Sequence, residues 1–426
     1  MYKEVLRSIK LKLLKIIFEN GVLFDEKLEI DFFSEARVST DEKHELIHLF
    51  NNFYANRTLT FTGLNASGKT QLLNTLVIAL NIIQAKSINY SPRRVIRNFG
   101  TNNILHLDNN KQVKFTIFFY DETDGNQTVN KLESIIARRF DEDEGEFKYV
   151  FVDEIFSRKN VKSIRSKKQI FDFTSIKEEN IITRNNDNKY VGLSSDVSIM
   201  NIFFNLNEIE KLYYKDKLSY TNFNILSGFG KIPHELITYL DPSIEKLEFI
   251  VNEENNTVRV ILKFVNQVSP IELESISELN NILSSGTVKG IGLFMDAFFT
   301  LRSGGIIIVD ELENHFNREI VSTFINLFLD RKMNPNGAVL IYSTHYSELL
   351  DIVPRNDSIY IVNKKRRISI EKFSNIIKRN DISKSDVFIK GMIDNSTPDY
   401  SSEHFLKEII KQRFLTKVGL EHGKKF

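Results

Sequence analysis

Cysteine and tryptophan are absent from the sequence, and so is any long apolar run. Without cysteine the chain has no disulfide scaffold and no thiolate nucleophile, and it cannot bind zinc or iron–sulfur clusters through thiolates. This composition fits a reducing compartment, and we expect a cytoplasmic protein. No segment approaches the roughly 18 apolar residues that span a bilayer. Residues 1–21 also lack the cleavage pattern of a signal peptide, so we predict no membrane contact.

An excess of charge of one sign is also missing. The chain carries 57 Lys and Arg against 56 Asp and Glu, a formal net charge of +1, which excludes a protein whose whole surface is basic. Two local basic clusters lie at residues 158–168 and 363–367. They have two interpretations, either solvated faces or a surface that binds the phosphates of DNA, RNA or tRNA. No aromatic residues are interleaved with them to stack on bases.

The length of 426 residues suggests two or three structural units. Short β-type runs predict strands at residues 9–17, 28–33, 57–61, 113–120, 147–152, 259–264, 305–309, 338–343 and 358–362. Apolar spacing predicts helices at residues 69–86, 131–140, 197–214, 234–240, 288–301, 317–330 and 403–415. After residue 283, continuous apolar strands alternate with helices. This alternation indicates an α/β fold with a parallel sheet.

The strongest motif is a phosphate-binding loop, G-x-x-x-x-G-K-[ST], which follows a predicted strand and opens a predicted helix. Its glycines let successive N–H groups point at phosphate oxygens, and the helix N-terminus adds partial positive charge. We expect Lys69 to reach the β- and γ-phosphates and Thr70 to ligate Mg²⁺. The expected nucleotide-binding residues of the loop are Gly63, Asn65, Ala66, Ser67, Gly68, Lys69 and Thr70.

A second motif is the apolar strand at 305–309, which ends in the acid pair Asp310-Glu311. The carboxyl edge of a parallel sheet is where ligands bind in open α/β folds. We expect Asp310 to hold Mg²⁺, directly or through water, and Glu311 to act as general base for the attacking water. Alone, such a pair could simply begin a loop. Downstream of a phosphate loop the catalytic interpretation is favoured.

Two further features complete the pattern. His345 follows the strand at 338–343, 35 residues after Asp310, and we expect it to contact the γ-phosphate from the same sheet edge. The turn Leu283-Ser284-Ser285-Gly286-Thr287 leads into a helix 25 residues before Asp310. Its hydroxyls and N–H groups suit an anion, although a plain helix cap has the same composition.

The order of phosphate loop, serine turn, acid pair and strand-end histidine resembles an ABC-type ATPase head. The turn reads Leu-Ser-Ser-Gly-Thr where transporters have Leu-Ser-Gly-Gly-Gln, and residues 310–315 read Asp-Glu-Leu-Glu-Asn-His. Both are similar to the OLD/RecF-like branch of prokaryotic ATPases, often found in anti-phage defence. The resemblance covers roughly residues 1–155 and 283–363.

The resemblance implies a P-loop NTPase head of the ABC type, a mixed sheet with an antiparallel β layer and an inserted helical lobe. It divides the chain into the first part of the ATPase lobe (1–155), an inserted mainly helical lobe (156–282), the signature helix with the second part of the ATPase lobe (283–370) and a C-terminal tail (371–426).

The resemblance also implies that two heads pair head to tail around ATP and Mg²⁺, so that Ser285 and Gly286 bind the γ-phosphate in trans, with Glu311 and His345 catalytic. A homodimer or higher oligomer is therefore expected. The glutamine loop of such heads is not identified; the candidates are Gln84, Gln112, Gln127 and Gln169.

Some members of that branch carry a C-terminal Toprim nuclease, but only 81 residues follow His345. The tail acids follow no two-metal pattern and are expected to face solvent; they are Asp381, Asp386, Asp394 and Asp399. We therefore expect an ATPase subunit that senses infection and controls a separate toxin or nuclease. The alternatives are a RecF/SMC-like DNA-maintenance ATPase, a transporter subunit and an ATP-binding scaffold. The absence of heptad repeats argues against the DNA-maintenance ATPase, and the altered serine turn argues against the transporter subunit. The presence of Glu311 argues against the scaffold.

Overall fold

A six-stranded mixed sheet lies at the centre of the computed structural model. The model describes residues 11–35, 38–89, 105, 111–123, 125–184, 192–207, 211–218, 232–252, 257–379, 382–390 and 400–422. The central strands, in spatial order, are β10 (Tyr214–Lys217), β14 (Ile306–Val309), β15 (Val339–Thr344), β5 (Thr58–Thr62), β16 (Ile359–Lys364) and β17 (Ile368–Lys372). Neighbouring strands from β10 to β16 pair in parallel, and β17 is antiparallel to β16. The predicted parallel α/β sheet is confirmed.

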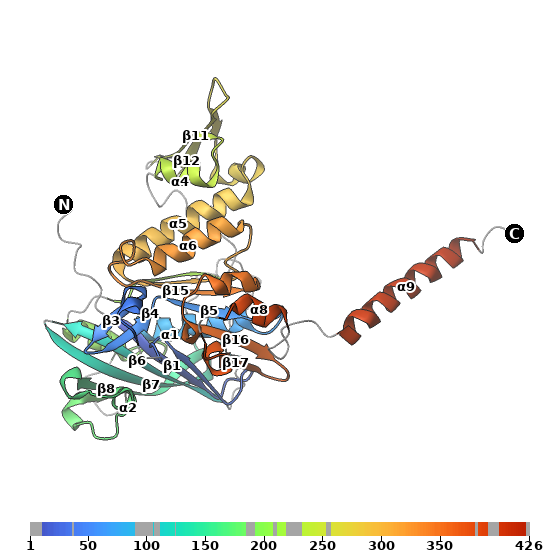
Figure 1. Ribbon diagram of the computed structural model, residues 1–426. Coiled ribbons are helices and arrows are strands. Elements are labelled where there is room, and N and C mark those ends of the chain that lie inside the picture. Colours follow the sequence, from blue (N-terminus) through green and yellow to red (C-terminus); the bar gives the residue numbers. More distant parts are fainter. Residues whose placement is uncertain are drawn as a thin grey trace.

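A second six-stranded sheet is antiparallel throughout and forms the predicted β layer. Its strands, in spatial order, are β2 (Lys27–Asp31), β1 (Lys12–Glu19), β6 (Gln112–Thr123), β7 (Asn126–Asp141), β8 (Glu146–Asn160) and β9 (Ile181–Thr183). Helix α1 (Lys69–Ile83) lies between the two sheets (Figure 1), and its buried face joins both in one core.

The helix predicted at 131–140 is wrong, because these residues belong to strand β7. Their burial alternates over most of this stretch, as in a strand with one face in the core. Residues 131–137 pair with β6 on one side, and the segment also pairs with β8 on the other. Pairing along two long neighbours overrides the helix propensity of Leu, Glu, Ala and Arg. Residues 142–145, within the acidic run at 141–146, form the turn between β7 and β8.

Helices α5 (Ser285–Ser303) and α6 (Arg318–Leu329) cover the other face of the central sheet. Side chains of α5, α6, β14 and β15 form a second buried cluster there. Figure 1 shows the resulting layers, with α5 and α6 above the central sheet and the antiparallel sheet below. The strand ends that carry the motifs are therefore held between two cores.

The expected mainly helical lobe at 156–282 is not what the structure shows. The α-helices in its described part are three short ones, α2 (Lys167–Phe171), α3 (Met200–Asn207) and α4 (His234–Leu240), beside strands β9 and β10. A small sheet follows, formed by β11 (Ile244–Asn252), β12 (Thr257–Phe264) and β13 (Ile271–Leu273), and it packs with α4 on α5. The boundary expected after residue 155 falls inside β8, and the one after residue 370 falls inside β17.

The remaining elements are short, apart from the last helix. Strands β3 (Leu46–Phe50) and β4 (Phe53–Asn56) form a hairpin, and α7 (Phe373–Ile376), α8 (Lys384–Ile389) and α9 (Tyr400–His422) end the chain. Helix α9 points away from the body in Figure 1. The tail acid Asp386 is exposed on α8, while Asp381, Asp394 and Asp399 lie outside the described residues. Short 3₁₀ helices occur at 41–45, 161–163, 178–180, 276–281, 347–351 and 356–358. None of the helices described could cross a bilayer, being too short or too polar.

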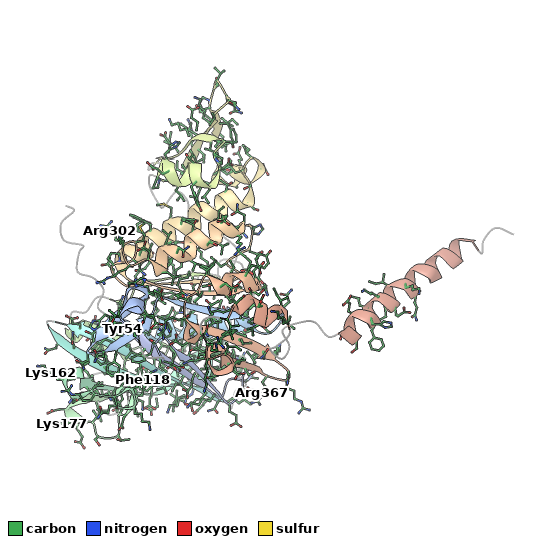
Figure 2. The ribbon with its side chains drawn as sticks, viewed as in Figure 1. Tyr54, Phe118, Lys162, Lys177, Arg302 and Arg367 are labelled. Carbon is green, nitrogen blue, oxygen red and sulfur yellow. The ribbon has the colours of Figure 1, made fainter. Side chains whose placement is uncertain are left out.

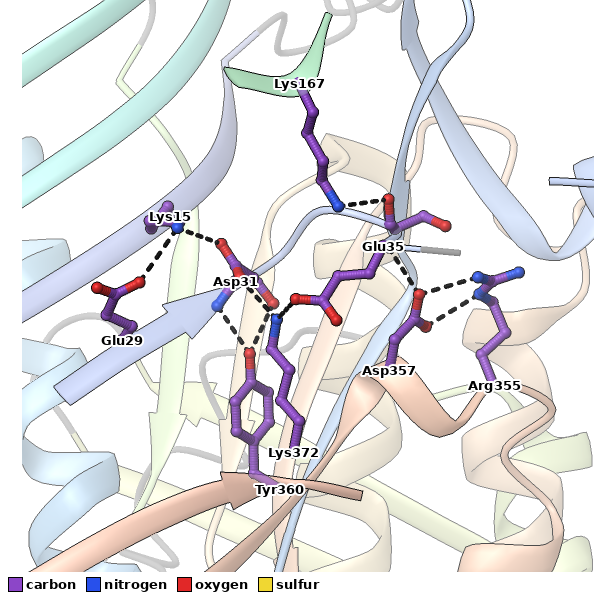
Figure 3. Close-up of polar contacts among 10 residues, drawn as sticks. Lys15, Glu29, Asp31, Glu35, Lys167, Arg355, Asp357, Tyr360 and Lys372 are labelled. Atoms are coloured by element: carbon purple, nitrogen blue, oxygen red, sulfur yellow. Dashed lines mark hydrogen bonds and ion pairs between the residues drawn. The ribbon is translucent and has the colours of Figure 1, made fainter. Parts of the chain in front are cut away.

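A cluster of buried charges joins the two sheets (Figure 3). The Lys372 ammonium, at the end of β17, contacts the carboxylates of Asp31 (2.6 Å) and Glu35. The Tyr360 hydroxyl accepts from the Asp31 N–H (2.7 Å), and the Glu35 N–H donates to Asp357 (2.7 Å). The cluster therefore fixes β2 and the chain after it against β16 and β17.

We expect Lys372→Ala to lower the free energy of unfolding by about 3 kcal/mol, because it removes the ammonium that contacts both Asp31 and Glu35 and leaves Asp31 with the Lys15 ammonium at 3.2 Å. Lys372 and Asp31 side chains are 10% and 12% exposed. The matched control is Lys407→Ala in the exposed pair with Glu403, for which we expect less than about 0.5 kcal/mol. Urea unfolding followed by circular dichroism measures both. Equal effects would contradict a stabilising role for the buried cluster.

Candidate nucleotide-binding site

The phosphate loop lies between β5 and α1, as the motif predicts. Both fixed glycines are required by the backbone. Gly63 and Gly68 have φ angles of 151° and 100°, and a Cβ on Gly63 would lie 2.3 Å from the carbonyl oxygen of Val362. A Cβ on Gly68 would lie 2.4 Å from the Ile368 side chain. The loop is therefore shaped by its contact with β16 and β17.

The Lys69 ammonium lies within this loop. It donates to the carbonyl oxygens of Gly63 (2.8 Å) and Leu64 (2.9 Å) and lies 3.1 Å from Nδ1 of His345. Burial lowers the pKa of Lys69 to about 8, although nearby carboxylates act in the opposite direction. Ser67 offers a second group to a ligand, because its buried hydroxyl has no hydrogen-bond partner among the residues described. These groups fit a bound phosphate chain.

Thr70 and Asp310 meet at the expected metal position. The Thr70 hydroxyl donates to Asp310 Oδ2 at 2.6 Å, and the Ser343 hydroxyl donates to Asp310 Oδ1 at 2.5 Å. Within the described ranges, no three His, Cys, Asp or Glu residues gather in a way that could hold a metal ion by themselves. The donor set fits Mg²⁺, which is commonly bound by one or two carboxylates with water and substrate phosphates.

Glu311 and His345 also lie together. His345 Nε2 is 2.9 Å from Glu311 Oε1, and the Asn314 amide donates to Glu311 Oε2 at 2.7 Å. Because the Lys69 ammonium can only donate, Nδ1 of His345 accepts and Nε2 carries the proton. Glu311 has a φ of +48°, unusual for a residue with a side chain, and its N–H donates to Ser343 Oγ at 2.7 Å. Hydrogen bonds thus run from Lys69 through His345 to Glu311.

The topology explains this convergence. Strand β15 lies between β14 and β5, so the acid pair, His345 and the phosphate loop follow three adjacent parallel strands. Val309 pairs with Tyr342 and Thr344 pairs with Thr62, so each motif begins at the same edge of the sheet. The edge location predicted for the acid pair and for His345 is what the structure shows, and the phosphate loop lies at the same edge.

Sequence reasoning assigned no role to three residues that contact the predicted ones: Ser343, Asn314 and Glu313. Glu313 is 7% exposed and accepts from the His345 N–H at 2.6 Å. Ser343 could have been found from strand register, because it stands opposite Asp310 when the two apolar strands are aligned. Asn314 and Glu313 carried no such signal, because both follow the end of β14.

The serine turn contacts the segment after the acid pair, not the phosphate loop. The Ser284 hydroxyl caps α5 by accepting from the Thr287 N–H (3.0 Å), and Ser285 Oγ lies 3.1 Å from His315 Nδ1. A Cβ on Gly286 would lie 2.6 Å from the His315 carbonyl oxygen. Over the described residues, neither Ser285 nor Gly286 hydrogen-bonds to the phosphate loop of the same chain.

A cavity of about 280 Å³ borders the acid pair beside α5. Lys289 of α5 lines it together with Asp310 and Glu311. Burial lowers the pKa of Lys289, and the Glu311 carboxylate opposes this effect. A cation of α5 therefore faces the expected base, which links the helix that follows the serine turn to the acid pair.

The four glutamine candidates do not reach this site in the described structure. Gln84 is buried at the far end of α1, and Gln169 is held in a capping box with Ser166. Gln112 and Gln127 pair with β7 and β6 in the antiparallel sheet. The glutamine loop is therefore not identified among these residues.

We expect ATP affinity to fall as the pH rises above about 8. Free Lys69 has a pKa of about 8, and bound phosphates favour its charged form, so the complex holds more protons than the free protein above that pH. Below this pH both forms are protonated and the affinity levels off. Titration calorimetry in two buffers of different ionisation heat measures the proton uptake. Lys69→Arg, which stays charged, is the control. If the wild type binds ATP above pH 8 without taking up protons, the lowered pKa of Lys69 is contradicted.

A family model described as "AAA domain, putative AbiEii toxin, Type IV TA system" matches residues 59–351. The match begins in β5 and runs past His345, so it includes the phosphate loop, the serine turn and the acid pair. No curated protein matches the chain. The matched family implies a P-loop NTPase fold, which agrees with the α/β architecture and its mixed sheet. Because the match covers more than half of the sequence, the chain belongs to this AAA-domain family.

Proposed function

We propose that the chain is a Mg²⁺-dependent ATPase that pairs with a second copy and regulates a separate toxin or nuclease in an anti-phage defence system. The observation that carries the ATPase proposal is the chain of hydrogen bonds from Lys69 through His345 to Glu311, beside the Thr70–Asp310 contact. All these residues lie at one sheet edge, where α/β folds bind ligands.

In the proposed reaction, N–H groups of the loop and the start of α1 bind the phosphates. Thr70 and Asp310 would hold Mg²⁺, which neutralises developing charge on the phosphoryl group. Glu311 accepts a proton from the attacking water, and His345 orients the Glu311 carboxylate through Nε2. The Ser67 hydroxyl, buried and unpartnered among described residues, donates to a phosphate oxygen.

The same contacts suggest how ATP binding reaches the base. In the structure, Lys69 donates to carbonyl oxygens of its own loop and to His345. Phosphates attract the ammonium more strongly than neutral acceptors do, so ATP draws it away from Nδ1. Nδ1 of His345 then loses the Lys69 donor. Its contact with Glu311 thus responds to the occupancy of the loop.

The link to defence draws on the family description, whose words name a toxin and a TA system. The separate effector draws on the same words, which name a toxin beside the AAA domain. The paired arrangement draws on the serine turn, which faces His315 and not the loop of its own chain. A nucleotide bound between two copies would contact the phosphate loop of one copy and the serine turn of the other.

A mixed-chain assay tests the paired site. Ser285→Arg is expected to bind ATP normally but hydrolyse it poorly, because bulk and charge at the turn block closure of the pair. Lys69→Ala chains lack the loop contact, and mixing the two variants should restore about one working site per mixed dimer.

The matched control for the turn is Ser277→Arg, the same change at an exposed position outside it. This variant should hydrolyse ATP like the wild type. Normal hydrolysis by Ser285→Arg would assign the turn to a helix cap only. If mixed dimers form but regain no activity, the proposal that each shared site hydrolyses ATP on its own is contradicted.

A further inference from the structure

Four consecutive cations form the tip of the β16–β17 hairpin: Lys364, Lys365, Arg366 and Arg367, here called the basic tip. All four are exposed. None makes an ion pair with any other residue that the structure describes. Figure 2 shows Arg367 at the edge of the body, with its side chain toward solvent. Unpaired exposed cations at this density are a site for a polyanion.

The basic tip is attached to the phosphate loop at both ends. Val362, two residues before the tip, has its carbonyl oxygen against Gly63, and Ile368, directly after the tip, packs on Gly68. Ile368 also hydrogen-bonds to the β1–β2 turn, donating to Leu23 (2.8 Å) and accepting from the Asp25 N–H (3.0 Å). A ligand on the tip therefore lies next to the loop that binds nucleotide phosphates.

The surroundings of the tip favour a nucleic acid over a protein partner. Protein interfaces have an apolar or aromatic centre, whereas nucleic-acid interfaces are more polar and more positive. In the described part of the hairpin and of the β1–β2 turn, no large hydrophobic side chain is exposed. Asp25 and Glu26 on that turn are exposed, so the positive potential is confined to the tip.

The other basic cluster differs, because half of its cations have structural roles. Arg158 pairs with buried Asp121 at 2.8 Å, Lys159 donates to carbonyl oxygens near α2, and Lys167 donates to the Ser34 carbonyl. The cations left exposed are Lys162, Arg165 and Lys168. This second set lies on other elements and provides a natural control.

We propose that the basic tip binds the phosphate backbone of a nucleic acid, without reading its sequence, beside the ATP site. The proposal adds a ligand class, a nucleic acid, to the sensor role in the proposed function. It rests on the proposed function only for that sensor role. We expect the four cations to contact phosphates, which carry no sequence information, so binding is electrostatic and salt-dependent.

The test compares two multiple variants of the full chain. One changes Lys364, Lys365, Arg366 and Arg367 to Gln, and the control changes Lys162, Arg165 and Lys168 to Gln. Fluorescence anisotropy with labelled DNA duplexes of about 30 base pairs gives Kd from about 50 to about 200 mM salt. For the tip variant, we expect affinity at low salt to fall at least about tenfold and the salt slope to shrink by about 3. The control variant should keep most of the wild-type affinity and most of the salt slope.

Several results would overturn the proposal. These are no duplex binding by the wild type, equal losses in both variants, a strong difference between two unrelated sequences, or equally tight binding of polyglutamate, which would assign the tip to an acidic protein. ATP affinity is measured separately with a fluorescent analogue. A tip variant that loses ATP but not duplex would assign the tip to the nucleotide. Because neither assay requires hydrolysis, failure here is distinct from failure of the ATPase proposal.

Discussion

Glu311→Gln is expected to bind ATP and Mg²⁺ but to hydrolyse ATP at least about 100-fold more slowly than the wild type, the usual scale for losing a positioned base. The amide cannot accept the proton of the attacking water. It keeps an oxygen for the hydrogen bond with His345, and the Asn314 amide can turn its own oxygen toward the new N–H group, so the fold should be unaffected. The slow variant should also hold the proposed pair closed. Phosphate release and chromatography with ATP measure these two effects.

Glu319→Gln is the matched control, because this exposed residue lies in the first turn of α6, away from the hydrogen-bonded chain. It should leave turnover unchanged. If Glu311→Gln hydrolyses ATP at the wild-type rate, another residue must be the general base. Slow turnover by both variants would point to an effect on α6 and not on proton transfer.

Lys69→Ala is expected to lose measurable ATP binding. A hydrogen bond to a charged group contributes about 1.5–3 kcal/mol, and here the phosphates would also face Asp310 and Glu311 without the cation between them. Only 5% of Lys69 is exposed, so water cannot easily replace the ammonium. Calorimetry or a fluorescent ATP analogue measures the affinity.

The control is Lys86→Ala, just beyond the other end of α1, whose ammonium lies over the Tyr214 ring and not in the loop. This variant should bind ATP as the wild type does. If Lys69→Ala also binds ATP with wild-type affinity, the assignment of the loop as the phosphate site is wrong.

The parts of the fold that the sequence predicted well are those whose chemistry restricts residue type. The glycines at 63 and 68 are required by close backbone contacts, and continuous apolar strands occur only where both faces of a sheet are buried. Hence the order of strand, loop and helix around Lys69 was predictable, as was the edge position of Asp310 and His345. Their catalytic roles are still predictions.

Other parts depend on contacts that no local pattern records. Residues 131–140 look helical until β6 and β8 are placed beside them. Strand β10 was not predicted, because its residues, Tyr-Lys-Asp-Lys, are mostly polar. These residues form a strand by pairing with β14. The contact between Ser285 and His315 joins residues 30 apart across the ends of two helices, and neither residue indicates the other.

The strand order also bears on the time at which activity can arise during synthesis. Strand β5, which carries the phosphate loop, lies between β15 and β16, both of which follow it by more than 270 positions in the chain. A nascent chain therefore exposes the loop long before either neighbour has left the ribosome. Contacts between such distant segments form late and slowly. Interrupted translation products that end before β16 should accordingly be unable to bind ATP, so only copies synthesised through β16 would join the nucleotide-dependent pool.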